Sequence, residues 1–214
     1  MESSLCPPAD PDFRLIETLA FRPGQGFVRL NRHLSRMARS AAALDIPFDR
    51  GAAIQALDSV AGQSPLRCRL TLTVDGTYDV TTGSLADNAP IWRIAIADTR
   101  LSATDVWLQH KTTQRSVYDA ARSSLPDGVD ELLFLNERDE LCEGTITNLF
   151  LNMPDGRCLT PKLTSGLLPG ILREELIDNK QVTESVLALT DLQNAEKVFV
   201  GNSLRGLIRA ELVI

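Results

Sequence analysis

Residues 143–150 read Glu-Gly-Thr-Ile-Thr-Asn-Leu-Phe, and they follow an apolar run at 132–135 and a polar turn at 136–140. Glu143 therefore stands where the chain re-enters apolar surroundings. Gly144 has no side chain, so it lets another group approach the backbone closely. A carboxylate in this position could hold a protonated ring nitrogen. Taken by itself, the same pattern is also typical of a solvated glutamate in a turn.

A lysine earlier in the chain stands in a comparable setting. Lys111 lies in the polar stretch 109–115, Gln-His-Lys-Thr-Thr-Gln-Arg, after a break in an apolar pattern. A lysine is nucleophilic only when deprotonated, and partial burial or nearby cations such as His110 or Arg115 lower its pKa. A lysine and a distant carboxylate fit a pyridoxal phosphate enzyme, in which they bind the aldehyde and the pyridine nitrogen. An ordinary surface lysine is the alternative interpretation.

Three further segments are candidate anion sites. Residues 163–170, Leu-Thr-Ser-Gly-Leu-Leu-Pro-Gly, precede a predicted helix, and Pro169 suits a first helical turn whose N–H groups can bind a phosphate. Residues 199–206, Phe-Val-Gly-Asn-Ser-Leu-Arg-Gly, can offer amides and a hydroxyl. His33 and Arg36 lie one helical turn apart, and arginine makes bidentate phosphate contacts. Each pattern also occurs without a ligand, in plain helix starts, turns and solvated basic faces.

Composition indicates a packed protein of one large domain or two small ones. The chain has 214 residues, of which 43% are hydrophobic and 23% charged. Its net charge of −6 disfavours non-specific nucleic-acid binding, which needs a basic face. No apolar run approaches the roughly 20 residues that span a membrane. The N-terminus lacks a basic segment followed by an apolar core, so we expect a cytoplasmic protein without a signal peptide.

Several other kinds of site have no support in the sequence. There is no GxGxxG after a strand, no GxxxxGK[ST] and no G-x-S-x-G. The two histidines, His33 and His110, lack metal-ligand spacing, so we expect no metal. The four cysteines show no CxxC spacing and are expected to be free thiols. Cys142, beside Glu143, is either reactive or a half-buried strand residue.

The hydrophobic pattern predicts an α+β chain in two parts. In the first part we expect strands at 13–21 and 28–30, a helix capped by Asn31, a helix at 49–60, and an antiparallel meander of 67–74, 77–82 and 91–97. In the second part we expect helices at 115–124 and 169–179 and strands near 130–136, 146–152, 157–160, 181–187 and 196–201. The simplest division is a smaller α+β domain at 1–103, a connection at 104–110 and a larger α/β domain at 111–214.

Together, these five segments of the chain resemble the fold type IV pyridoxal phosphate enzymes. They lie at 33–36, 109–115, 143–150, 163–170 and 199–206. That group includes branched-chain aminotransferases, D-amino acid aminotransferases and 4-amino-4-deoxychorismate lyases. The resemblance runs from Glu17 to Ala210, and its most specific parts are 143–150 and Ser-Gly-Leu-Leu-Pro-Gly at 165–170. It implies the two-domain α+β fold of the D-amino acid aminotransferases and a homodimer. The start of the chain departs from the group, because residues 10–16 replace a Gly-Asp-Gly-like turn.

The resemblance also implies a role for each matched residue. Lys111 would be the Schiff-base lysine, and Glu143 would bind the pyridine nitrogen of pyridoxal 5'-phosphate. The other implied cofactor residues are Arg36, the amides of Ile171 and Leu172, the loop residues Asn202 and Ser203, and the supporting Asn148. Two residues, Thr18 and Arg205, are candidates for the substrate side by position alone.

Within the group, residues 110–118 and 202–206 resemble the aminodeoxychorismate lyase branch most. This implies conversion of 4-amino-4-deoxychorismate to 4-aminobenzoate and pyruvate, a step of folate biosynthesis. A class IV aminotransferase acting on branched-chain or D-amino acids is the alternative. A non-catalytic binding protein that has kept the fold is a third possibility.

Overall fold

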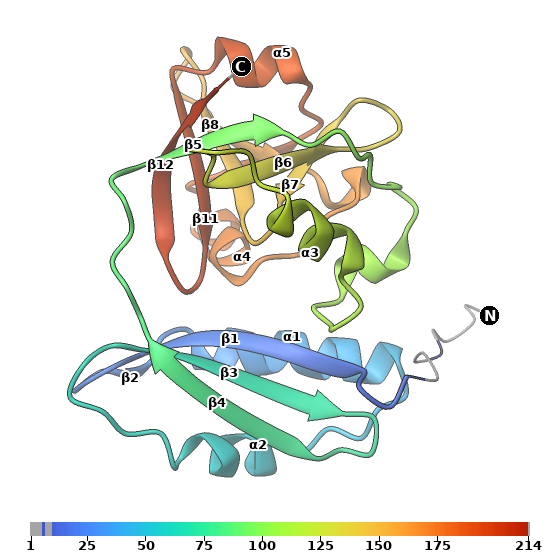
Figure 1. Ribbon diagram of the computed structural model, residues 1–214, viewed down its shortest axis with the longest axis vertical. Coiled ribbons are helices and arrows are strands. Elements are labelled where there is room, and N and C mark those ends of the chain that lie inside the picture. Colours follow the sequence, from blue (N-terminus) through green and yellow to red (C-terminus); the bar gives the residue numbers. More distant parts are fainter. Residues whose placement is uncertain (1–5, 7–9, 214) are drawn as a thin grey trace. The chain divides into compact units, whose positions relative to one another are not determined.

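The computed structural model describes Cys6 and residues 10–213, and within them the chain forms two compact units (Figure 1). The first unit contains the chain up to Asp87 together with His110–Gln114. The second contains Asn88–Gln109 and the chain from Arg115 onward. These bounds differ from the expected 1–103 and 111–214. Most of the N-terminal segment, for which we expect no signal peptide, lies outside the described residues.

The first unit is an antiparallel sheet with two helices. Its strands have the order β2-β1-β3-β4. They are β1 (Arg14–Arg22), β2 (Gly26–Phe27), β3 (Leu66–Thr73) and β4 (Tyr78–Ser84), and the helices are α1 (Leu30–Ala43) and α2 (Arg50–Leu57). In β3 the residues Cys68, Leu70 and Leu72 are buried while their neighbours are less so. This period of two is the reason that the strand could be predicted.

The start of α1 differs from the prediction. We expected a strand at 28–30 and a cap at Asn31, but β2 ends at Phe27 and the helix begins at Leu30. The left-handed backbone of Gly24 and Gly26, with φ of 75° and 77°, turns the chain early and pairs Phe27 with Phe21. The N-cap is then Arg29, which is also left-handed (φ 56°) and makes no side-chain cap hydrogen bond.

The second unit is built on an eight-stranded mixed sheet with the order β10-β9-β8-β11-β12-β5-β6-β7. Because β7 also pairs with β8, the strands from β8 through β11, β12, β5 and β6 to β7 form a closed circuit. The strands are β5 (Ile91–Ile96), β6 (Glu131–Leu135), β7 (Leu141–Gly144), β8 (Asn148–Asn152), β9 (Cys158–Pro161), β10 (Thr183–Ser185), β11 (Lys197–Asn202) and β12 (Gly206–Leu212). The helices are α3 (Ser116–Ser123), α4 (Ile171–Asp178) and α5 (Leu189–Asn194), with short 3-10 turns at Val106–Gln109 and Leu163–Ser165.

Strand β5 lies in this sheet and not in the meander of the first unit, which corrects our expectation for 91–97. It pairs in parallel with β12 and with β6. Both partners are far away in sequence, so no local turn signal announces them. Strands β7 and β12 and helix α5 were also missing from the predicted set.

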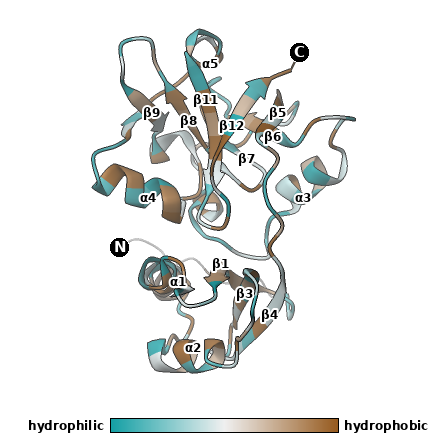
Figure 2. Ribbon diagram, turned by 90° about the vertical axis from the view of Figure 1, so that its left-hand side faces the viewer, coloured by the Kyte–Doolittle hydropathy of each residue, from teal (hydrophilic) through white to brown (hydrophobic). Residues whose placement is uncertain are grey.

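The core of the second unit lies on both faces of β6. Leu133 and Leu135 pack with residues of β5, β8 and β11, whereas Leu132 and Phe134 belong to a second cluster beside α3. A strand covered on both faces is expected to be a continuous apolar run. Figure 2 shows the same hydrophobic character along the central strands β8 and β11. Among the described residues, no helix is both long and apolar enough to span a bilayer.

Candidate active site

The predicted site residues fall into two sets, one in each unit. Thr18, Arg36 and Lys111 belong to the first unit. The second unit holds the others, which are Glu143, Asn148, Ile171, Leu172, Asn202, Ser203 and Arg205.

Lys111 is held by its neighbours along the edge of β1. The N–H of Ile16 donates to the Lys111 carbonyl at 2.9 Å, and the N–H of Thr113 donates to the Arg14 carbonyl at 2.9 Å. Thr112 forms a bridge with Leu15. Because these contacts pair its backbone with β1, the segment around Lys111 extends the sheet like a short added strand. Lys111 is also partly buried. It is therefore not a residue of a loose surface loop.

His110 differs from our expectation of a nearby cation. Its Nδ1 lies 3.0 Å from the hydroxyl of Ser40 in α1. Burial lowers the pKa of His110, so the imidazole is neutral near pH 7. It ties the segment before Lys111 to α1 and brings no positive charge to the lysine.

Arg36 takes part in a buried ion pair of the first unit. Its Nε donates to Glu17 Oε1 at 2.9 Å, and its Nη2 donates to Glu17 Oε2 at 2.7 Å. Nδ1 of His33 lies 2.6 Å from the same Oε2. Burial would raise the pKa of Glu17, but the charges and hydrogen bonds of Arg36 and His33 lower this pKa to about 2. Glu17 therefore holds the edge of the guanidinium that carries Nε and Nη2.

Glu143 is the best-defined candidate of the second unit. It lies in β7 and is 6% exposed. Its Oε1 accepts hydrogen bonds from the hydroxyl of Tyr118 at 2.8 Å and from the N–H of Leu168 at 3.0 Å. The amide of Asn148 approaches Oε2 at 3.4 Å. Three donors around one carboxylate match its ionised form, which can only accept.

Tyr118 serves Glu143 as a neutral donor. Burial raises the pKa of Tyr118, and the negative charge of Glu143 raises it further. The phenol therefore keeps its proton at any working pH and donates it towards Glu143. Tyr118 ends the 110–118 motif, but no local pattern in the sequence shows which carboxylate it contacts.

Asn148 and Gly170 set the start of α4. The amide of Asn148 donates to the Leu168 carbonyl at 3.1 Å. A Cβ at Gly170 would overlap Asn148 Oδ1, so this position requires glycine. Gly170 is the N-cap of α4, and because glycine has no side chain it cannot cap the first amides of the helix itself. The first-turn amides of Ile171 and Leu172 are the kind of donor that binds phosphate at a helix N-terminus.

Asn202 shapes the loop between β11 and β12. Its Nδ2 donates to the Ile146 carbonyl at 3.1 Å, and its Oδ1 accepts from the N–H groups of Leu204 and Arg205 at 3.0 and 2.9 Å. These bonds make Asn202 a residue that orders the loop. Ser203, which follows it, is buried and offers a hydroxyl and an amide to an anion.

The two substrate-side candidates have different surroundings. Arg205 donates from Nη1 to Asn88 at 2.9 Å, and its guanidinium lies 5.5 Å from the ring centroid of Trp92. These contacts fix Arg205 within its own unit. Thr18 is half-buried in β1 and stands opposite Arg69.

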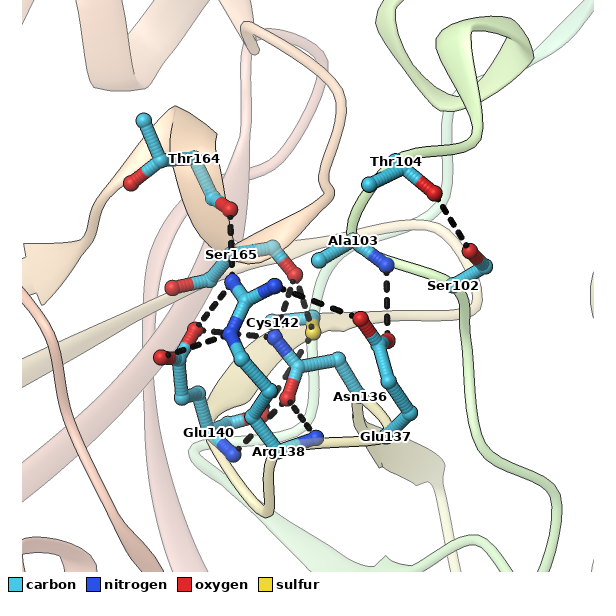
Figure 3. Close-up of polar contacts among 10 residues, drawn as sticks. All are labelled: Ser102, Ala103, Thr104, Asn136, Glu137, Arg138, Glu140, Cys142, Thr164 and Ser165. Atoms are coloured by element: carbon cyan, nitrogen blue, oxygen red, sulfur yellow. Dashed lines mark hydrogen bonds and ion pairs between the residues drawn. The ribbon is translucent and has the colours of Figure 1, made fainter.

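A polar network anchors the loop that leads to Leu168 (Figure 3). Asn136 donates to the Ser165 carbonyl at 2.9 Å, and Arg138 donates to the Thr164 carbonyl at 2.9 Å. Cys142 also donates to the Ser165 carbonyl, at 3.1 Å. Burial and the charge of Glu143 raise the pKa of Cys142 to about 12, so this thiol packs and does not react. The network steadies the 163–168 loop, whose end contacts Glu143.

The donor set fits pyridoxal phosphate. Glu143, surrounded by donors, matches a protonated pyridine nitrogen. The first-turn amides of α4, which begins after Gly170, match a phosphate. Lys111 is a partly buried lysine on a fixed backbone, which suits a covalent anchor.

Comparison with known proteins gives one family over almost the whole chain. The family model described as Amino-transferase class IV matches residues 14–213. A protein from Schizosaccharomyces pombe named "Putative aminodeoxychorismate lyase" is 28% identical, over 94% of this chain and 90% of that protein. A solved structure from Mesorhizobium loti, named "Putative amino-acid aminotransferase", is 42% identical with a TM-score of 0.89, over 94% of this chain and 100% of that one.

A further solved structure shares the fold at lower identity. It is the PLP-bound form of a hypothetical aminotransferase from Mycobacterium tuberculosis, 19% identical with a TM-score of 0.80, over 93% of this chain and 81% of that one. The chain therefore belongs to the class IV aminotransferase family, with the fold of the fold type IV pyridoxal phosphate enzymes.

Proposed function

We propose that this protein is a pyridoxal phosphate-dependent lyase that converts 4-amino-4-deoxychorismate to 4-aminobenzoate and pyruvate. The observation that carries the proposal is Glu143, a buried carboxylate with hydrogen-bond donors from Tyr118 and Leu168. The name of the Schizosaccharomyces pombe relative supports the choice of a lyase. So do the residues around Lys111 and in the 202–206 loop.

Each matched residue has a part in binding the cofactor in this proposal. Lys111 bonds to the cofactor aldehyde, and Glu143 keeps the proton on the pyridine nitrogen. The phosphate is bound by Arg36, by the amides of Ile171 and Leu172, and by the 202–203 loop with Asn202 and Ser203. When bound, pyridoxal phosphate supplies an aldehyde that condenses with amines and a protonated ring that accepts electrons.

Lys111 has two tasks in the lyase reaction. It anchors the cofactor before the substrate amine arrives, and its freed amine then removes the proton from the substrate ring. The carbon–oxygen bond to the enolpyruvyl group breaks as the ring becomes aromatic, and the released enolate takes up a proton to give pyruvate. Glu143 accepts hydrogen bonds from the Tyr118 hydroxyl and the Leu168 N–H, which hold its carboxylate in place.

The direct test compares two lysine variants. Lys111→Ala should lose both the visible absorbance of the bound cofactor and the release of pyruvate from aminodeoxychorismate. Lys197→Ala, which changes an exposed lysine of β11, should keep both. A Lys111→Ala protein that stays yellow and turns over at the wild-type rate would rule out the assignment.

Amino-acid transamination is the second candidate, and the Mesorhizobium loti structure supports it by its name. In that case Lys111 would move a proton between the substrate carbon and the cofactor. Branched-chain or D-amino acids, added without a keto acid, would convert the bound cofactor to its amine form. A lyase would instead release pyruvate from aminodeoxychorismate and leave the cofactor spectrum unchanged after turnover.

We also propose that the protein acts in the cytoplasm as a homodimer on small molecules. The net charge of −6 supports the absence of nucleic-acid binding. Light scattering of the purified protein tests the dimer directly, because a mass of one chain, 23.5 kDa, would contradict it.

A further inference from the structure

Glu131 is a fully buried carboxylate that accepts most of its hydrogen bonds from one turn, at 145–147, and one from the N–H of Leu132 at 3.1 Å. It begins β6 and is 0% exposed. Its Oε1 accepts from the N–H of Thr145 at 3.0 Å and from the hydroxyl of the same residue. Its Oε2 accepts from the N–H of Ile146 at 3.2 Å and from the hydroxyl of Thr147 at 2.9 Å. A buried charge requires such donors, so carboxylate and turn fix one another.

The turn between β7 and β8 carries the proposed partner of the pyridine nitrogen. Glu143 is the residue before Gly144, and it pairs with Asn148 on the other side of the turn. A Cβ on Gly144 would lie 2.8 Å from the Glu131 carboxyl carbon, so glycine is required there. The shape that Glu131 imposes on 144–147 therefore decides where Glu143 and Asn148 lie.

The same turn also supports the proposed phosphate loop. The Ile146 carbonyl accepts from Asn202 Nδ2 at 3.1 Å, while the N–H of Ile146 donates to Glu131. Asn202 in turn holds the N–H groups of Leu204 and Arg205. The backbone of Ile146 thus links the two parts of the site, because its N–H contacts Glu131 and its carbonyl contacts Asn202 of the 202–205 loop.

Arg122 adds a cation beside the carboxylate. Its Nη1 lies 3.6 Å from Glu131 Oε1 and donates to the hydroxyl of Thr145 at 3.1 Å. The arginine side chain is 38% exposed, so solvent screens this pair. The donors of the turn, which are buried or partly buried, are therefore the main partners of Glu131.

We propose that Glu131 is a positioning residue that couples the pyridine-nitrogen partner to the phosphate loop, so that the two ends of the cofactor are bound in register. This inference rests on the proposed function. If Glu131 only stabilised the folded protein, its loss would reduce the folded fraction and weaken all ligands equally. If Glu131 positions the loop, its loss also reduces the contribution of the phosphate group to the binding of the cofactor.

The test compares two ligands on one set of apoproteins. Dissociation constants are measured for pyridoxal phosphate and for pyridoxal, which lacks the phosphate. In Glu131→Gln, the new amide group places a hydrogen against a hydrogen-bond donor of the turn, so the turn must shift. The dissociation constant of pyridoxal phosphate should therefore rise about tenfold or more. The ratio of the pyridoxal constant to the pyridoxal phosphate constant should fall severalfold, because the 202–205 loop moves.

Two controls separate this effect from lost stability. Leu192→Ala makes a cavity in the core beside α5, which weakens both ligands equally and leaves the ratio at the wild-type value. Thr147→Val removes one donor to Glu131 and keeps the carboxylate, so it should lower the ratio less than Glu131→Gln does. Thr147→Ser keeps the hydroxyl and should restore the ratio. The Thr147 variants decide the matter if Glu131→Gln does not fold.

Ser203→Ala distinguishes failure of this inference from failure of the proposed function. If Ser203→Ala lowers the ratio while Glu131→Gln and Thr147→Val leave it at the wild-type value, the coupling role of Glu131 is wrong and the proposed phosphate loop stands. If Ser203→Ala itself leaves the ratio unchanged, the proposed phosphate loop is wrong and the coupling falls with it.

Discussion

Glu17 and Glu143 are both buried carboxylates, but their partners differ in kind. Glu17 is paired with the cation of Arg36 and with His33. Glu143 has neutral donors, the Tyr118 hydroxyl and the Leu168 amide. The two donors to Glu143 come from α3 and from the loop before α4, so they fix the direction in which this carboxylate lies. This fixed orientation supports the assignment of the pyridine nitrogen to Glu143.

Glu143→Gln is expected to reduce kcat by about 100-fold or more, a loss of the size seen when one charge-stabilising group is removed from an active site. A neutral amide cannot favour the protonated ring nitrogen. Its hydrogens also face the Tyr118 hydroxyl or the Leu168 N–H. Steady-state release of pyruvate measures the effect, with Glu211→Gln, an exposed residue of β12, as control. Near-wild-type kcat in Glu143→Gln would remove this residue from the mechanism.

Glu17 should make stability depend on pH in the acid range. Its pKa is lowered to about 2 from an ordinary value of 4.5. The stabilisation is therefore present above about pH 4.5 and disappears as the pH falls towards 2. Its size is about 3 kcal/mol in the free energy of unfolding. Urea unfolding from pH 7 to pH 2.5 measures it.

The matched variant for that measurement is Glu17→Gln. It should flatten the acid dependence and lower the free energy of unfolding at pH 7 by about 3 kcal/mol, because Arg36 is left without its buried partner. Glu140, whose pKa the hydrogen bond from Arg138 lowers to about 2, contributes equally to the acid dependence of both proteins, so the difference between them reports on Glu17. An unchanged slope in Glu17→Gln would show that the ion pair does not set the acid sensitivity.

Elements with a local signature could be predicted, and elements defined by distant pairing could not. The β3–β4 hairpin has alternation and an Asp75-Gly76 turn, and α3 and α4 begin within two residues of their predicted starts. Strand β7 has only four residues, all buried, so it shows no alternation. Lys111 and Glu143 could be chosen as candidates from the sequence. The pairing of Glu17 with Arg36, of Tyr118 with Glu143 and of Glu131 with the 145–147 turn could not, because each joins residues that are distant in sequence.

Gly170→Ala tests how α4 is placed. The new methyl group would overlap Asn148 Oδ1, so either α4 or Asn148 must move. We expect the free energy of unfolding to fall by about 1–3 kcal/mol and the dissociation constant of pyridoxal phosphate to rise about tenfold. Gly83→Ala in β4, where a Cβ meets only ordinary contacts with Arg67, should change neither quantity. Unchanged cofactor affinity in Gly170→Ala would remove the start of α4 from the phosphate site.

At the scale of the whole molecule, each unit supplies part of the proposed chemistry. The first unit holds Lys111 on the edge of β1, and the second holds Glu143 in a closed circuit of strands. Membership of the class IV aminotransferase family covers both units, since the match runs from residue 14 to residue 213. In the proposed function, Lys111 is the one residue that bonds covalently to the cofactor.

Reduction of the bound cofactor tests that claim most directly. The purified protein is incubated with pyridoxal phosphate, treated with borohydride, digested and analysed by mass spectrometry. We expect the reduced cofactor on the peptide that contains Lys111, and not on the peptides with Lys162, Lys180 or Lys197. Labelling of one of those three lysines in place of Lys111, or an unlabelled Lys111 in a protein that has bound the cofactor, would show that Lys111 is not the covalent anchor.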